Sequence, residues 1–312
     1  MRRAPLAAIV VAIVGVSFAS VFIRWSMALG AAALVIALYR MGFATLLLAP
    51  FLATAKGAQL RRLTARDFAL LAVIGLALAA HFATWILSLA LVDVATSVVL
   101  VTSHPLLVAA VSHVVFRERV TRGVAVGIAL GFGGVVLIAF AQGGQGTSTL
   151  VGSALAFLGA IFAGIYLLAG RRLRQRIDLV PYATTVYGFS FLFLLAFAAL
   201  AATPVVVRDN AVPLMGIFLA MALVSQIGGH TMYNYALKHV SATLVSTSLL
   251  GEPVGASVLA FLFLGETPGC HAGGVCAATG LVVLGSAFAL AGIYLTARGS
   301  LRSPPGSLEA QV

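Results

Sequence analysis

ALVDVATSVVLVTSHP (residues 90–105) and ALKHVSATLVSTSLLGEP (residues 236–253) share one order of features. Each stretch starts with Ala-Leu, continues through Ala-Thr and ends in a proline that follows a polar residue. In both cases a glutamate comes thirteen residues after the proline, at Glu118 and at Glu266. This recurrence predicts that the chain is built from two copies of one unit.

The composition around these stretches indicates a membrane protein. Hydrophobic residues make up 62% of the chain, charged residues only 9%, and the mean hydropathy is +1.12. Soluble domains carry about 25% charged residues. A membrane-spanning helix needs roughly 20 apolar residues. Ten such runs occur, near 5–24, 30–54, 67–89, 94–116, 122–141, 149–170, 180–202, 213–235, 242–264 and 272–297. Each is predicted to be helical, because the bilayer interior offers no hydrogen bonds to a backbone.

The positions of lysine and arginine predict the orientation. If the N-terminus is cytoplasmic, sixteen of these residues fall in cytoplasmic segments and two, Arg24 and Arg208, fall outside. The loop after the first glutamate is basic, whereas its counterpart at 265–269 has no lysine or arginine. Equivalent loops on opposite sides of the membrane differ in this way, and an odd number of helices in each copy inverts the second copy.

We therefore expect an all-α membrane protein of ten transmembrane helices in two inverted five-helix repeats. The repeats are expected at residues 1–145 and 146–297, followed by a disordered cytoplasmic tail at 298–312. The expected location is a bacterial inner membrane, with both termini cytoplasmic. Inverted repeats around a site at the membrane midplane are a recurring design of secondary transporters.

The sequence resembles the EamA-type drug/metabolite transporter superfamily. The resemblance covers almost all of residues 5–296 and is carried by Ser17-Phe18-Ala19-Ser20, by Tyr39-Arg40 and by the doubled pattern with a glycine-rich helix after each copy. It implies a carrier for small metabolites, often amino acids or other polar solutes, that frequently works as an exporter. It does not name a substrate.

Arg40 and Glu252 are the charged residues deepest in the apolar runs. A charge at the centre of an inserted helix costs on the order of 3 kcal/mol, so such residues are usually functional. Arg40 is a candidate anchor for a substrate carboxylate or a partner for Glu252; a structural arginine bonded to carbonyls is the alternative. Glu252 is the best candidate for proton coupling or for binding an amino group, against the alternative of a neutral acid bonded to a freed carbonyl.

The residue that corresponds to Glu252 in the first copy is His104, which precedes Pro105. Because proline interrupts the helical hydrogen bonds, the two polar-Pro pairs predict two kinked helices that face one cavity.

Polar stripes on two other runs are expected to face the same cavity. One stripe holds His81, Thr84, Trp85 and Ser88, and the other holds Gln226, His230, Tyr233 and Asn234. Tyr166 aligns with Phe22 of the first copy and could close one side of the cavity. Helices 3, 4, 8 and 9 are expected to supply most of the wall, with helices 1 and 6 as gates. The substrate-binding candidates are thus Arg40, His81, Trp85, His104, Tyr166, His230, Asn234 and Glu252.

Small residues predict a close helix pair. Gly127 and Gly131 form a GxxxG pattern, and Gly280 and Gly285 roughly mirror it in the second copy. Such patterns allow backbones to approach closely within a membrane and need no ligand to explain them.

Several other functions lose support. The net charge of +11 is explained by topology rather than by nucleic acid. No HExxH, GxSxG or GxxxxGK[ST] motif occurs, which argues against a membrane-embedded enzyme and against an ATP-driven pump. No cofactor or metal is expected. A non-transporting assembly subunit would not need polar residues at depth, while an uncoupled facilitator or channel stays open. The expected partners are a small-molecule substrate, the lipid bilayer and protons as a coupling ion, in a monomer or homodimer.

Overall fold

The computed structural model describes residues 3–53, 57–88, 91–92, 94–115, 120–141, 149–265 and 278–302. Glu118 and Glu266 of the repeated pattern lie outside these residues, as does the predicted tail from residue 303 onward. Within the described ranges every regular element is a helix, and ten helical segments are long and apolar enough to cross a membrane.

Six of these segments are single α-helices. They are α1 (Arg3–Ala28), α3 (Ala65–Ser88), α6 (Arg122–Ala141), α7 (Leu150–Arg174), α8 (Leu179–Leu200) and α13 (Thr279–Arg302). The second segment joins α2 (Ala33–Leu48) to the short 3₁₀ turn η1 (Ala49–Ala53), and η2 (Gly57–Arg62) follows it. The ten segments overlap the ten predicted apolar runs one by one, so the predicted fold class is confirmed.

The fourth and ninth segments are broken at the repeated prolines. The fourth consists of α4 (Val94–Val101) and α5 (His104–Val114). The ninth consists of α11 (Ala242–Ser248), the 3₁₀ turn η4 (Leu249–Gly251) and α12 (Glu252–Leu264). Proline stands in the first turn of α5 and of α12, where its missing N–H is not needed. The polar residue before each proline thus begins the second half-helix, close to the middle of the span.

The eighth segment contains a π-helix. It runs from α9 (Ala211–Met221) through η3 (Ala222–Thr231) to α10 (Met232–Leu237), and η3 is π-helical along its length. The hydroxyl of Thr231 donates to the carbonyl of Gln226, five residues earlier, at 3.1 Å. The sequence stripe Gln226-His230-Tyr233-Asn234 assumed a regular α-helical period, and this assumption was wrong for residues 222–231. π-Helices are rare and concentrate at functional sites.

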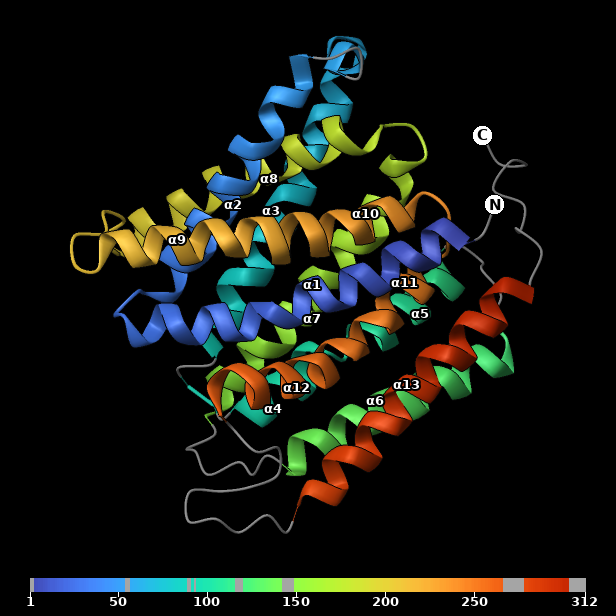
Figure 1. Cartoon of the computed structure of the whole chain (residues 1–312). Helices are drawn as coiled ribbons and strands as arrows, with labels where there is room; N and C mark the ends of the chain where they lie inside the picture. Colours follow the sequence, from blue (N-terminus) through green and yellow to red (C-terminus); the bar gives the residue numbers. More distant parts are fainter. Residues whose placement is uncertain are drawn as a thin grey trace.

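The packing repeats across the two halves. Helix α1 packs on α12 and on η3 of the second half, and the equivalent α7 packs on α4 and α5 and on α3 of the first half. Helices α2 and α8, which occupy equivalent places, contact each other. Every repeat therefore completes its core with helices from the other one, and Figure 1 shows the two halves interleaved.

Helices α6 and α13 form the closest helix pair and run side by side at the edge of the bundle (Figure 1). A Cβ atom on Gly134 would overlap the backbone of Gly285 and Ala289, and one on Gly292 would overlap the backbone of Gly127 and Gly131. The predicted role of Gly280 was wrong, because a Cβ at Gly280 would meet no atom within 4 Å. On α13 it is Gly285 and Gly292, one face of the helix, that admit α6.

Candidate functional site

A cavity of about 50 Å³ lies among the broken helices, α1, α2, α3, α7 and the π-helical segment. Seven of the eight candidate residues line it: Arg40, His81, Trp85, His104, Tyr166, His230 and Glu252. The eighth, Asn234, lies behind the wall, where its side-chain oxygen accepts a hydrogen bond from the Tyr166 hydroxyl at 2.9 Å. Residues from nearly the whole length of the chain, from Val16 to Glu252, thus meet around one small space.

The lining extends the predicted set of helices. Helices 3, 4, 8 and 9 supply most of it, as expected, but α1 contributes Val16 and Ala19 and α7 contributes Ala163 and Leu167 beside Tyr166. Helices 1 and 6 are therefore part of the wall itself. Of the predicted stripe on α3, His81 and Trp85 face the cavity, whereas Thr84 and Ser88 bond carbonyls of their own helix.

Arg40 reaches the cavity from α2 and is only 2% exposed. Its Nε donates to Oε1 of Gln226 at 2.7 Å, and its Nη2 donates to the carbonyl of Ser225 at 3.4 Å. The guanidinium also lies over the ring of Phe82, 4.5 Å from the ring centre. Gln226 and Ser225 are both in the π-helical segment, so this segment supplies the two oxygens that bind Arg40.

An ion pair between Arg40 and Glu252, one of the alternatives considered for Arg40, is not formed between these two described side chains. Arg40 instead donates to Gln226 and to the carbonyl of Ser225, as the alternative of a structural arginine expects. Glu252 begins α12 and lines the cavity half-buried. No hydrogen bond of its carboxylate to a described residue is seen; its backbone carbonyl accepts a long bond from Ser17 Oγ at 3.4 Å. Its carboxylate therefore remains available to the contents of the cavity.

His104, the counterpart of Glu252, is buried and has a partner. Its Nδ1 lies 3.0 Å from the hydroxyl of Ser246 on α11. This bond joins the fourth and ninth segments, and so the two repeats, directly beside the cavity.

His81 and Trp85 stack one turn apart on α3, with ring centres 6.0 Å apart. Nδ1 of His81 lies 2.9 Å from the carbonyl oxygen of Gly159. Because a carbonyl only accepts, Nδ1 of His81 donates in this bond. Trp85 lines the cavity, and its Nε1 is buried without a hydrogen-bond partner among the described residues.

A chain of hydrogen bonds leads from the cavity into the core. The Tyr166 hydroxyl donates to Asn234, the Asn234 amide donates to the hydroxyl of Tyr187 at 3.3 Å, and that hydroxyl lies 2.9 Å from Thr231. Thr231 in turn donates to the backbone carbonyl of Gln226. The side-chain oxygen of the same Gln226 accepts from Arg40. One connected network thus links Tyr166 on one wall to Arg40 on another.

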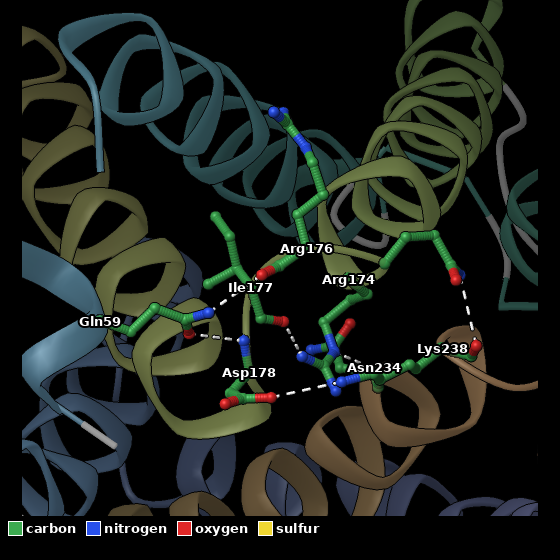
Figure 2. A network of polar contacts seen from close by, with 8 residues as sticks. Gln59, Arg174, Arg176, Ile177, Asp178, Asn234 and Lys238 are labelled. Atoms are coloured by element: carbon green, nitrogen blue, oxygen red, sulfur yellow. Dashed lines mark hydrogen bonds and ion pairs between the residues drawn. The ribbon is translucent and has the colours of Figure 1, made fainter. Parts of the chain in front are cut away.

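A second polar network closes one end of the bundle (Figure 2). Arg174, only 2% exposed, donates from Nε to the backbone carbonyl of Asn234 at 2.9 Å and from Nη1 to the carbonyl of Ile177. Gln59 bonds both the carbonyl of Arg176 and the N–H of Asp178, at 2.9 and 2.8 Å. The network is completed by two ion pairs, Arg176–Asp67 at 3.2 Å and Lys238–Asp178 at 3.3 Å.

Sequence reasoning missed the role of Arg174, since an arginine at the end of an apolar run looks like a topology signal. The structure buries it against the end of α10, where it binds a carbonyl of the same Asn234 that contacts Tyr166. His239, in the turn after α10 and outside the spans, has its pKa lowered by partial burial and by the positive charges of Lys238 and Arg174.

A cavity with buried charged and polar residues, lying between two discontinuous helices of a ten-span bundle, is an arrangement typical of secondary transporters. The model of the EamA-like transporter family matches this chain twice, at residues 4–140 and 150–298. The chain therefore belongs to the EamA-like transporter family, a family of transporters and not of enzymes.

Two further comparisons agree with this assignment. An uncharacterized transporter of Bacillus subtilis (strain 168), YyaM, is 24% identical over 223 residues, which cover 67% of this chain and 65% of that protein. The chain thus spans slightly less than two thirds of the length of this relative. A crystal structure whose description names no function matches 97% of this chain and 100% of its own, with a TM-score of 0.71 and 20% identity. At this identity the match shows the fold alone.

Proposed function

We propose that this protein is a secondary carrier that exports small metabolites such as amino acids by alternating access around the cavity. The observation that supports this most directly is the convergence of Arg40, Glu252 and three histidines, contributed by both repeats, on one cavity lined otherwise by aromatic and aliphatic side chains. Polar residues inside a membrane protein mark substrate and ion pathways.

The chemistry of the lining suits a zwitterion with an apolar side chain. Arg40 offers a cation to a carboxylate, and Glu252 offers a carboxylate to an ammonium group. Trp85, Phe82 and Tyr166 supply aromatic surface beside them. Nε1 of Trp85, which has no hydrogen-bond partner among the described residues, adds one donor.

The size of the cavity favours a carrier over an open channel. A cavity needs about 10 to 15 Å³ for each water, so 50 Å³ holds about three to five waters. Ligand pockets measure roughly 300 to 1,000 Å³. A metabolite can therefore bind only after the helices move apart, which is what rocking of two repeats around a central site provides.

Glu252 is the proposed proton-coupling residue. It lies at the start of a half-helix, it faces the cavity, and its carboxylate has no hydrogen bond to a described residue that would fix its protonation. A carboxyl in this position can bind a proton on one side of the membrane and exchange it for the ammonium group of a substrate.

The proposal is tested in two stages with the purified protein. A substrate screen by thermal stabilisation finds binders, because a ligand that binds only the folded state raises the melting temperature. Flux of the best binder into proteoliposomes is then compared for wild type, Arg40→Ala and Glu252→Gln. Arg172→Ala and Asp209→Asn, both at exposed positions, are the matched controls. If Arg40→Ala and Glu252→Gln leave the flux and its pH dependence at wild-type values, this site assignment is wrong.

A further inference from the structure

The guanidinium of Arg40 is held along one of its two edges. The side edge consists of Nε and Nη2, and both donate to oxygens of the π-helical segment, Oε1 of Gln226 at 2.7 Å and the carbonyl of Ser225 at 3.4 Å. The end edge contains Nη1, for which no hydrogen bond to a described residue is seen. Since Arg40 lines the cavity, the end edge is the one available to a bound molecule.

Both oxygens that hold Arg40 are neutral. A carboxylate in place of the Gln226 amide would form a buried ion pair with the guanidinium and cancel most of its charge. The amide instead accepts the same hydrogen bond and leaves the positive charge in place. The face of the guanidinium rests on Phe82, 4.5 Å away, which restricts its rotation without adding any negative charge.

The backbone of residue 226 is held in place around the Gln226 amide. The side chain is fully buried, and the backbone carbonyl of Gln226 accepts the hydroxyl of Thr231, which contacts Tyr187 on α8. The π-helical spacing brings the Thr231 hydroxyl to a carbonyl five residues earlier, a contact that a regular α-helix does not favour. The amide itself is directed by Arg40, which donates to its oxygen, while its Nε2 has no hydrogen-bond partner among the described residues.

We propose that Gln226 is a positioning residue for the site: its neutral oxygen fixes the side edge of Arg40 so that the end edge binds the anionic group of the substrate. This inference rests on the proposed carrier function and adds that the substrate bears a carboxylate or a similar anion. A glutamine at this place confers selectivity because it orients the cation without neutralising it.

The first test measures whether the two side chains act together and needs no substrate. Thermal unfolding of the full chain in detergent is compared for wild type, Arg40→Met, Gln226→Leu and the double variant. Gln226→Leu is expected to lower the melting temperature by about 5 °C in the wild-type background and by about 1 °C or less in the Arg40→Met background. Equal effects in both backgrounds would mean that Gln226 does not act on Arg40, and the inference would be overturned.

The second test measures selectivity with three probes that share a phenyl group and a short chain and differ in their charged groups: L-phenylalanine, phenethylamine and 3-phenylpropionate. Wild type is expected to be stabilised by both carboxylates more than by the amine. Gln226→Glu keeps the hydrogen bond to Arg40 and adds a charge, so it is expected to bind the two carboxylates about tenfold more weakly while the amine binds at least as well. If Gln226 had only a structural role, this isosteric change would alter the binding of all three probes by the same factor.

Gln175→Glu is the control, because it adds the same charge at an exposed position at the end of α7 and is expected to leave the ratio between the probes unchanged. If Gln226→Glu also keeps the wild-type ratio, the positioning role is overturned. If wild type binds none of the three probes, the amino-acid form of the proposed function fails, and the thermal cycle alone then decides the role of Gln226.

Discussion

The two broken helices of this protein are equivalent by sequence and by place in the fold, yet they do different things at the cavity. In the first repeat, α5 begins with His104, whose ring is buried and bonded to Ser246. In the second, α12 begins with Glu252, whose carboxylate faces the cavity without a bond to a described residue. A duplicated scaffold thus supplies one structural and one chemically available polar group.

The difference follows from how the half-helices pack. Helix α11, which carries Ser246, packs on α5, which begins with His104. Within the described residues, the corresponding helix α4 does not pack closely on α12, which begins with Glu252. The first repeat therefore pairs its histidine, while no side chain of α4 is placed to pair the glutamate of the second.

The largest effect on transport is expected from removing the ionisable group at each of the two positions. Glu252→Gln should reduce coupled flux by about 100-fold, as expected for loss of a proton-binding group at the site, and should flatten its pH dependence. His104→Asn, which keeps a nitrogen near the place of Nδ1, should reduce flux by less than about threefold. Proteoliposome flux of a substrate found by the thermal screen measures both. A larger loss for His104→Asn than for Glu252→Gln would reverse the assignment of roles.

A smaller effect is expected from breaking the bond in the first repeat. Ser246→Ala leaves the buried Nδ1 of His104 without a partner, which costs about 1 to 3 kcal/mol. Ser246→Thr keeps the hydroxyl and serves as the control. Thermal or denaturant unfolding of the purified chain gives the measurement, and equal stability of the alanine and threonine variants would show that the His104–Ser246 bond contributes nothing.

The smallest effect concerns the turn before the second broken helix. The pKa of His239 is lowered by burial and by Lys238 and Arg174, so protonation of this ring opposes the folded state. Its contribution to stability is therefore complete at neutral pH and decreases as the pH falls below about 6.5, the ordinary histidine pKa. His239→Gln should remove part of the acid-induced loss in melting temperature, a difference below about 2 °C. An unchanged acid-induced loss would exclude this contribution.

The sequence by itself determined the ten spans, the position of both helix breaks and most of the polar residues that meet at the cavity. These features are local: apolar length decides a span, a proline without an N–H decides a break, and the cost of burying polar groups in lipid turns their stripes inward. Seven of the eight candidate residues could be placed at the cavity on these grounds, and Asn234 falls one contact behind it.

Only the tertiary structure decided which polar groups pair. The sequence left open whether Arg40 pairs with Glu252, and in the structure it bonds Gln226. Arg174 looked like a topology signal but is buried on Asn234, and Gly292 rather than Gly280 meets α6. Each outcome depends on the rotation and depth of one helix against another, which the packing of the whole bundle sets. The π-helical segment is the clearest case, because Gln226 in it meets Arg40 of α2 and Thr231 meets Tyr187 of α8, contacts that no local pattern in residues 222–231 contains.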